Sequence, residues 1–99
     1  MTREQEDYIR SLEGFKHCGD HKDLKDYEFI ITVNSDGKFS YSYNVVVKYI
    51  YQYDILYWAR PEDLSPSILN IILNQWPSWR REEYMEDLKR YNENKTKSL

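Results

Sequence analysis

A long alternation of apolar and polar residues through the middle of the chain limits the possible folds more than any other feature. The odd positions of 27–33 are apolar or aromatic, and the same alternation continues from 39 to 57. A period of two, rich in aromatic and β-branched side chains, predicts β-strands with one buried face. Asp36-Gly37 lies between the two segments and supplies the backbone freedom of a tight hairpin turn. The two segments therefore predict an antiparallel hairpin.

The second segment is too long for a single strand, because strands seldom exceed about ten residues. We expect a break or bulge between Asn44 and Gln52, which gives three antiparallel strands in a meander. The odd positions should form the buried face, so Tyr49 is expected to be buried and Gln52 exposed. A helix is the alternative for this segment, but it explains fewer of the apolar positions, namely Val46, Ile50, Tyr53 and Tyr57.

Helices are predicted before and after the sheet. Thr2 and Gln5 have the spacing of a capping box, and an apolar face follows at helical intervals, formed by Tyr8, Ile9, Leu12 and Phe15. Ser65-Pro66 is a typical helix start, a capping serine followed by a proline in the first turn. The helix that it begins is apolar around most of its circumference and ends at Pro77.

A last helix is predicted to begin at Ser78, with one apolar side formed by Tyr84, Met85, Leu88 and Tyr91. Glu86 and Arg90 have the spacing of a helix-supporting ion pair. The tail from 92 to 99 is polar and is expected to fray. Residues 1–99 thus predict one α+β domain: a short N-terminal helix, a three-stranded meander, and two C-terminal helices packed on the sheet.

Charge and cysteine content exclude several classes of protein. The net charge is −3 and the two signs are interspersed, so the basic surface of a DNA-binding protein is missing. The acidic residues of the last helix alternate with basic ones, which is typical of a solvated face. Cys18 is the single cysteine, which excludes an internal disulfide and suits a reducing compartment. With no apolar segment of membrane-spanning length, we expect an intracellular protein that uses no membrane.

One stretch resembles a reactive or metal-binding site, His17-Cys18-Gly19-Asp20-His21. Structural zinc sites usually need four protein ligands, commonly in two separated pairs, and no further His or Cys occurs in the chain. A cysteine nucleophile with a neighbouring histidine base seldom has the required geometry. No sequence motif of a known enzyme class is present. We therefore predict a protein that is not an enzyme, with no catalytic residue, no metal and no cofactor.

The aromatic content points to a binding surface. Ten tyrosines, three tryptophans and three phenylalanines exceed what a domain of 99 residues usually buries. We expect the exposed rings to bind a partner protein or a second copy in a homodimer, and we name as candidates Trp58, Trp79, Tyr41, Tyr43 and Tyr51. The alternative is a nucleic-acid-binding module that stacks bases on a tyrosine-rich sheet face. The same face would instead be core if the 65–76 helix covers it.

The chain resembles, in general character and without a shared motif, the small orphan proteins of phages and archaeal viruses. The tyrosine-bearing strand Phe39-Ser40-Tyr41-Ser42-Tyr43 is an example of that character. The resemblance implies an accessory protein of a virus or mobile element that acts in the host cytoplasm. Such a protein works by binding a host or viral protein, in some cases as an inhibitor of a host factor.

Overall fold

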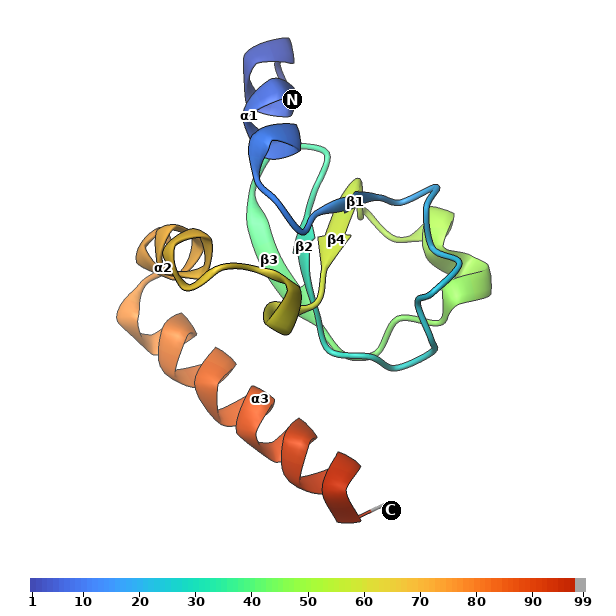
Figure 1. Ribbon diagram of the computed structural model, residues 1–99, viewed down its shortest axis with the longest axis vertical. Helices are drawn as coiled ribbons and strands as arrows, with labels where there is room; N and C mark the ends of the chain where they lie inside the picture. The colour runs from blue at the N-terminus through green and yellow to red at the C-terminus, as the bar shows by residue number, and fades with distance from the viewer. Residues whose placement is uncertain (98–99) are drawn as a thin grey trace.

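The computed structural model describes residues 1–97 and has an α+β architecture, as the sequence predicted (Figure 1). In chain order its elements are α1 (Arg3–Ser11), β1 (Lys16–His17), β2 (Ile30–Val33), β3 (Phe39–Ser42), the 3-10 helix η1 (Val47–Gln52), β4 (Tyr57–Ala59), the 3-10 helix η2 (Pro61–Asp63), α2 (Pro66–Asn74) and α3 (Ser78–Lys97). No helix within residues 1–97 is long and apolar enough to cross a membrane.

The strands form one antiparallel sheet in the order β1-β4-β2-β3. The hairpin of β2 and β3 is confirmed, and Gly37 takes the positive φ of 82° that its turn requires. The predicted meander is wrong, since β4 pairs with β2 on the side away from β3. The connection from 43 to 56 is long enough to bring the chain back past the hairpin. Strand β1 was missed because two residues are too few to show a period.

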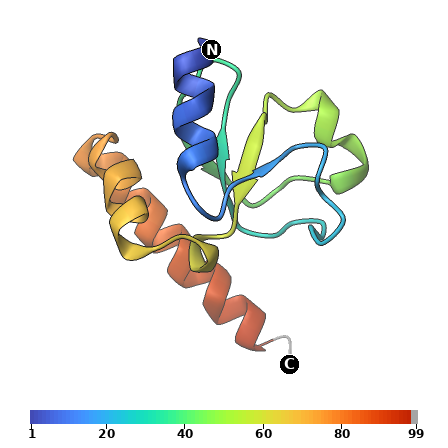
Figure 2. The ribbon, with the colours of Figure 1, turned by 45° about the horizontal axis from the view of Figure 1, so that its top comes forward.

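Both faces of the sheet are covered. Ile31 of β2 and Tyr41 of β3 face α2 and α3, in a core cluster that also includes Phe29, Ile72, Trp76 and Tyr84. Val33 lies at the other end of β2 and packs with Tyr57 against Ile9 of α1. The even positions face the segments around 18–28 and 43–56, in a second cluster formed by Leu24, Ile30, Val45, Ile50 and Trp58. The helices and these two segments lie on opposite sides of the sheet in both ribbon views (Figures 1 and 2). All four residues of β2 are consequently buried.

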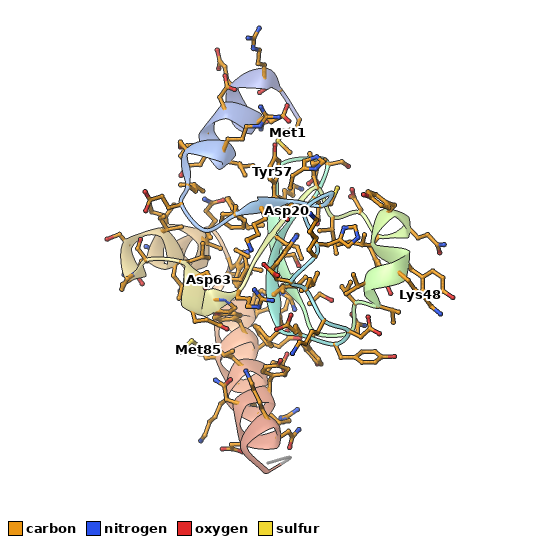
Figure 3. All side chains as sticks on the ribbon, turned by 45° about the vertical axis from the view of Figure 1, so that its right-hand side comes forward. Met1, Asp20, Lys48, Tyr57, Asp63 and Met85 are labelled. Atoms are coloured by element: carbon orange, nitrogen blue, oxygen red, sulfur yellow. The ribbon has the colours of Figure 1, made fainter. Side chains whose placement is uncertain are left out.

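The predicted break between Asn44 and Gln52 is confirmed, and η1 occupies it. The expectation that Tyr49 is buried is wrong, because a 3-10 turn has a period of three and ends the alternation of faces. Ile50 anchors the segment in the core, while the tyrosines on either side of it point outwards: Tyr49, Tyr51 and Tyr53. The side chain of Lys48 also extends away from the domain (Figure 3).

The helix starts follow the predicted local signals. Thr2 and Gln5 form both hydrogen bonds of the capping box, and Ser65 Oγ accepts a hydrogen bond from the backbone N–H of Ile68 at 3.2 Å. Helix α1 is held over the sheet by Tyr57, whose hydroxyl accepts from Arg10 Nε and donates to a carboxylate oxygen of Glu6, both at 3.0 Å (Figure 3).

Helix α3 differs from its prediction in two ways. Met85 was expected on the apolar side, but it is exposed and points away from the sheet (Figure 3). The helix also continues to Lys97, whereas the residues from 92 on were expected to fray. Tyr91 packs against the core and fixes the turn that precedes the polar end. Residues 98–99 of the predicted tail lie outside the described residues.

Candidate functional site

Two of the five predicted surface residues are buried, and three are exposed. Trp58 has 1% of its surface exposed and Tyr41 7%, so neither is available as a surface anchor. Trp58 was expected at the surface, but β4 is flanked on both sides by strands and the Trp58 ring becomes part of the core. Tyr43, Tyr51 and Trp79 are exposed to 47%, 69% and 64%.

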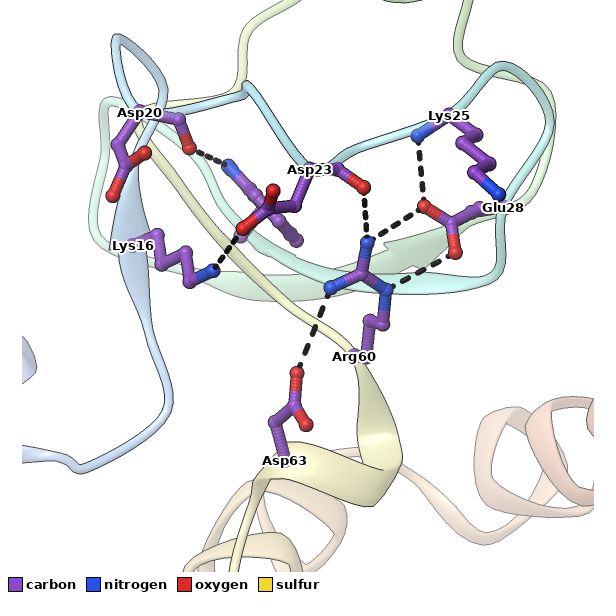
Figure 4. A network of polar contacts seen from close by, with 8 residues as sticks. Lys16, Asp20, Asp23, Lys25, Glu28, Arg60 and Asp63 are labelled. Carbon is purple, nitrogen blue, oxygen red and sulfur yellow. Dashed lines mark hydrogen bonds and ion pairs between the residues drawn. The ribbon is translucent and has the colours of Figure 1, made fainter.

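Trp58 also contacts a polar network, and Figure 4 labels its members Asp20 and Arg60. Its indole N–H donates to the carbonyl oxygen of Asp20 at 3.1 Å, and Arg60 lies over its ring at 5.3 Å. Arg60 forms two hydrogen bonds to the carboxylate of Glu28, at 2.9 and 3.0 Å, and one to the carbonyl oxygen of Asp23. All these bonds lie within the fold. The network therefore ties the 18–28 segment to the sheet and serves structure.

Burial and hydrogen bonding act in opposite directions on Glu28 in this network. Burial raises the pKa of its carboxyl group, but the hydrogen bonds from Arg60 and from the backbone N–H of Lys25 outweigh it. The pKa of Glu28 is therefore lowered below its ordinary value. The carboxylate stays charged in the folded state, as a bidentate arginine pair requires.

One of the exposed aromatic residues, Tyr43, lies where the end of β3 meets α3. A hollow of about 210 Å³ opens there, lined by Tyr41, Ser42, Tyr43, Asn44, Arg80, Glu83 and Asp87. Trp79 precedes Glu83 by one helical turn, and residues at this spacing are neighbours on a helix surface. We call the set Tyr43, Asn44, Trp79, Arg80, Glu83 and Asp87 the β3–α3 surface.

Tyr41 forms the inner wall of this hollow. Its hydroxyl donates to Asp87 Oδ2 at 2.7 Å, and the guanidinium of Arg80 lies over its ring at 4.3 Å. Arg80 is paired in turn with Glu83 at 3.2 Å. Burial, and then the hydrogen bond to the Asp87 carboxylate, raise the pKa of Tyr41. The phenol therefore stays protonated at neutral pH and acts as a donor to Asp87.

Tyr43 stands at the rim of the hollow. Its ring stacks on Phe29 with centroids 5.8 Å apart and an interplanar angle of 6°. Tyr43 and Asp87 also line a second hollow of about 170 Å³, together with Arg90, Tyr91 and Asn94. The half-exposed ring and the carboxylate thus form the wall between two neighbouring depressions.

The outer edge of β3 beside this site is protected. Trp76 Nε1 donates to the carbonyl oxygen of Phe39 at 3.0 Å. Arg80 reaches across the edge, with its guanidinium over the Tyr41 ring on one face and 3.5 Å from Ser40 Oγ. Side chains that cover an edge strand hinder the addition of a further strand. The surface is therefore suited to contacts through side chains.

The remaining exposed candidate, Tyr51, lies elsewhere. It contacts the ring of His21 edge-on at 5.9 Å, on the side of the sheet opposite α3. His21 Nδ1 is hydrogen-bonded to the carbonyl oxygen of Cys18 at 2.9 Å, and His17 Nδ1 accepts from the N–H of Gly19 at 3.1 Å. Within the part of the chain that the structure describes, no group of three or more His, Cys, Asp or Glu side chains is placed to hold a metal ion.

Sequence reasoning missed the polar half of the β3–α3 surface. The acidic residues of α3 were interpreted as a solvated face, yet the side chain of Asp87 is only 15% exposed. Its partner Tyr41 is 46 residues away in the sequence, so no local pattern reports the contact. A scan against protein-family models gives no match, and searches of curated proteins and of solved structures give none either. Function is therefore argued from the surface itself.

Proposed function

We propose that this protein acts without catalysis, by binding another protein through the β3–α3 surface. The observation that carries the proposal is the half-exposed ring of Tyr43, held rigidly on Phe29 at the rim of a polar hollow. Tyrosine and tryptophan are the residues most often found as anchors in protein interfaces. Trp79 supplies a second exposed ring on the same surface.

The packing behind the surface supports a role as a preformed anchor. Phe29 contacts Tyr43 and three further rings, those of Tyr41, Tyr84 and Tyr91. A ring fixed in this way loses little conformational freedom when a partner binds. The surface then needs no rearrangement before it forms an interface.

A protein is favoured over a nucleic acid as the partner. Glu83 and Asp87 line the hollow, and carboxylates repel a phosphate backbone. The alternative of base stacking on a tyrosine-rich sheet face loses its support, because α2 and α3 cover that face and bury Tyr41. The net charge of −3 likewise disfavours binding to the phosphate backbone of a nucleic acid.

The further parts of the hypothesis concern the partner. An origin in a virus or mobile element, a site of action in the host cytoplasm and the inhibition of a host factor stay predictions. A homodimer is the special case in which the partner is a second copy of the chain.

A photoreactive phenylalanine analogue in place of Trp79 tests the proposal in the cells that naturally make the protein. We expect irradiation to attach one partner protein covalently at position 79. The control is the same analogue in place of Tyr8, which is 46% exposed but lies on α1. Equal attachment at both positions, or no protein attached at position 79, would contradict the proposal.

A further inference from the structure

The hollow beside Tyr43 has the size of a site for one side chain. Its volume of about 210 Å³ lies below the roughly 300–1,000 Å³ of pockets that take whole small-molecule ligands. It is open to solvent and is lined by Asn44 and by residues of α3, so a residue of a docked partner can enter it. The polar groups of its wall therefore decide which side chain fits.

The charged residues that line the hollow carry one net negative charge. Arg80 is neutralised by Glu83 at 3.2 Å and is further occupied by the ring of Tyr41. Among the described residues, the hydrogen bond that Asp87 accepts comes from a neutral group, the hydroxyl of Tyr41. The seven lining residues thus carry one positive and two negative charges. The hollow favours a cation.

Arg90 also lies close to Asp87. Its Nη1 lies 4.0 Å from Asp87 Oδ1, at the outer limit of an ion pair. Its Nη2 is paired with Glu86 at 3.1 Å on the exposed side of α3. Arg90 and Glu86 together add no net charge, so the charge of Asp87 remains available to a ligand.

The shape of the wall selects among cations. The Tyr43 ring packs nearly parallel to the ring of Phe29, and about half of the surface of Tyr43 stays exposed to solvent. A planar guanidinium can stack on a tyrosine ring and donate two parallel hydrogen bonds to a carboxylate, whereas an ammonium group cannot do both. We propose that this hollow binds the guanidinium group of an arginine side chain of the partner protein, an inference that rests on the proposed function.

The test is an NMR titration of the full chain with N-acetyl-arginine amide, followed through backbone amide shifts. We expect binding in roughly the millimolar range, with the shifts concentrated in residues 42–44 and 80–87. The matched probe is N-acetyl-citrulline amide, which has a similar shape and no charge. It should bind about tenfold more weakly, because it lacks the charge-assisted hydrogen bonds.

Two variants locate the site. Asp87→Asn removes the charge but keeps an oxygen that accepts from Tyr41, and it should weaken binding of the arginine probe about tenfold. Glu82→Gln is the control, because it removes the same charge from an exposed residue of α3 that does not line the hollow. It should leave binding within about twofold of the original value.

Three results would each overturn the inference: no saturable shifts with the arginine probe, equal binding of the citrulline probe, or full binding by Asp87→Asn. The probe binds without a partner protein, so this titration is independent of the cross-linking experiment. If the titration fails while position 79 still attaches a partner, the proposed function stands and only the arginine pocket is lost.

Discussion

Replacement of Tyr84 by phenylalanine should stabilise the protein. Tyr84 has no exposed surface, and its hydroxyl is the buried side-chain polar atom for which no hydrogen-bond partner is found among the described residues. The ring is enclosed by three others, those of Phe29, Tyr41 and Trp76, at centroid distances of 5.6, 5.3 and 5.5 Å. Folding therefore removes the hydroxyl from water and returns no bond to it.

The size of the effect follows from two opposing contributions. An unsatisfied buried hydroxyl costs about 1–3 kcal/mol. Removal of the hydroxyl leaves a small void in the packed core, and several van der Waals contacts of about 0.1–0.2 kcal/mol each are lost. We expect a net increase of about 1 kcal/mol in the free energy of unfolding, which raises the melting temperature by roughly 4–8 °C in a domain of this size.

The pKa of Tyr84 supplies a second readout. Burial, and to a smaller extent Glu62, raise this pKa from 10.0 to about 12 in the folded protein. The unfolded chain loses the phenolic proton first, so stability falls as the pH rises from about 10 towards 12. The decline should be shallower in Tyr84→Phe. Tyr41 also has a raised pKa, so some decline remains in the variant.

Urea denaturation of Tyr84→Phe and Tyr57→Phe checks this reasoning. The Tyr57 hydroxyl forms two hydrogen bonds, to Arg10 and Glu6, so its removal should lower the free energy of unfolding by about 1–3 kcal/mol. Opposite signs for the two variants are the expected result. A loss of 1 kcal/mol or more in Tyr84→Phe would refute the argument and would mean that the hydroxyl has a partner such as a buried water.

Four further predictions concern the stability of the fold and the absence of a structural metal. Arg60→Met should lower the free energy of unfolding by about 3 kcal/mol, because it leaves the largely buried carboxylate of Glu28 without its partner. Arg90→Met removes an exposed ion pair and should lower the free energy of unfolding by less than about 1 kcal/mol in the same denaturation assay. The pKa of Glu28 is lower in the folded state, so the ionised carboxylate stabilises the fold above its ordinary pKa of 4.5, and this stabilisation is lost as the pH falls. Arg60→Met should therefore reduce the loss of stability in acid, which thermal melts at a series of pH values measure. Gly14→Ala should destabilise by more than about 1 kcal/mol, because Gly14 has a φ of 108° and a new Cβ would lie 2.5 Å from the carbonyl oxygen of Asp63. A strong chelator should leave the melting temperature unchanged, and a fall of several degrees would revive the metal hypothesis.

Features decided by a few neighbouring residues could be predicted from the sequence. The turn at Asp36-Gly37 and the helix start at Ser65-Pro66 form as their local chemistry requires. The burial of Trp58 could not be predicted, because it depends on pairing with β1, a strand of two residues about 40 positions earlier in the chain. The length of the segment 39–57 predicted a break but not its form, because a 3-10 turn and a bulge interrupt a period of two equally well.

The candidate site was predicted only in part, for a similar reason. Tyr43 and Trp79 were identified because exposed aromatic residues are conspicuous in a small domain. The link between Tyr41 and Asp87 joins residues 46 positions apart, and it depends on how α3 crosses the sheet. Asp87 follows Tyr84 by three residues and precedes Tyr91 by four, so helical spacing places it on the buried side of α3, but this spacing does not identify Tyr41 as its partner.

The affinity of the partner captured at position 79 for two tyrosine variants tests the central claim most directly. Tyr43→Ala removes an anchor of the β3–α3 surface, and Tyr51→Ala removes a more exposed ring on the opposite side of the sheet. With both variants folded, as judged by their melting temperatures, we expect Tyr43→Ala to weaken binding by roughly tenfold or more and Tyr51→Ala by less than about twofold. The reverse order, or equal losses from both, would contradict the assignment of the β3–α3 surface as the binding site.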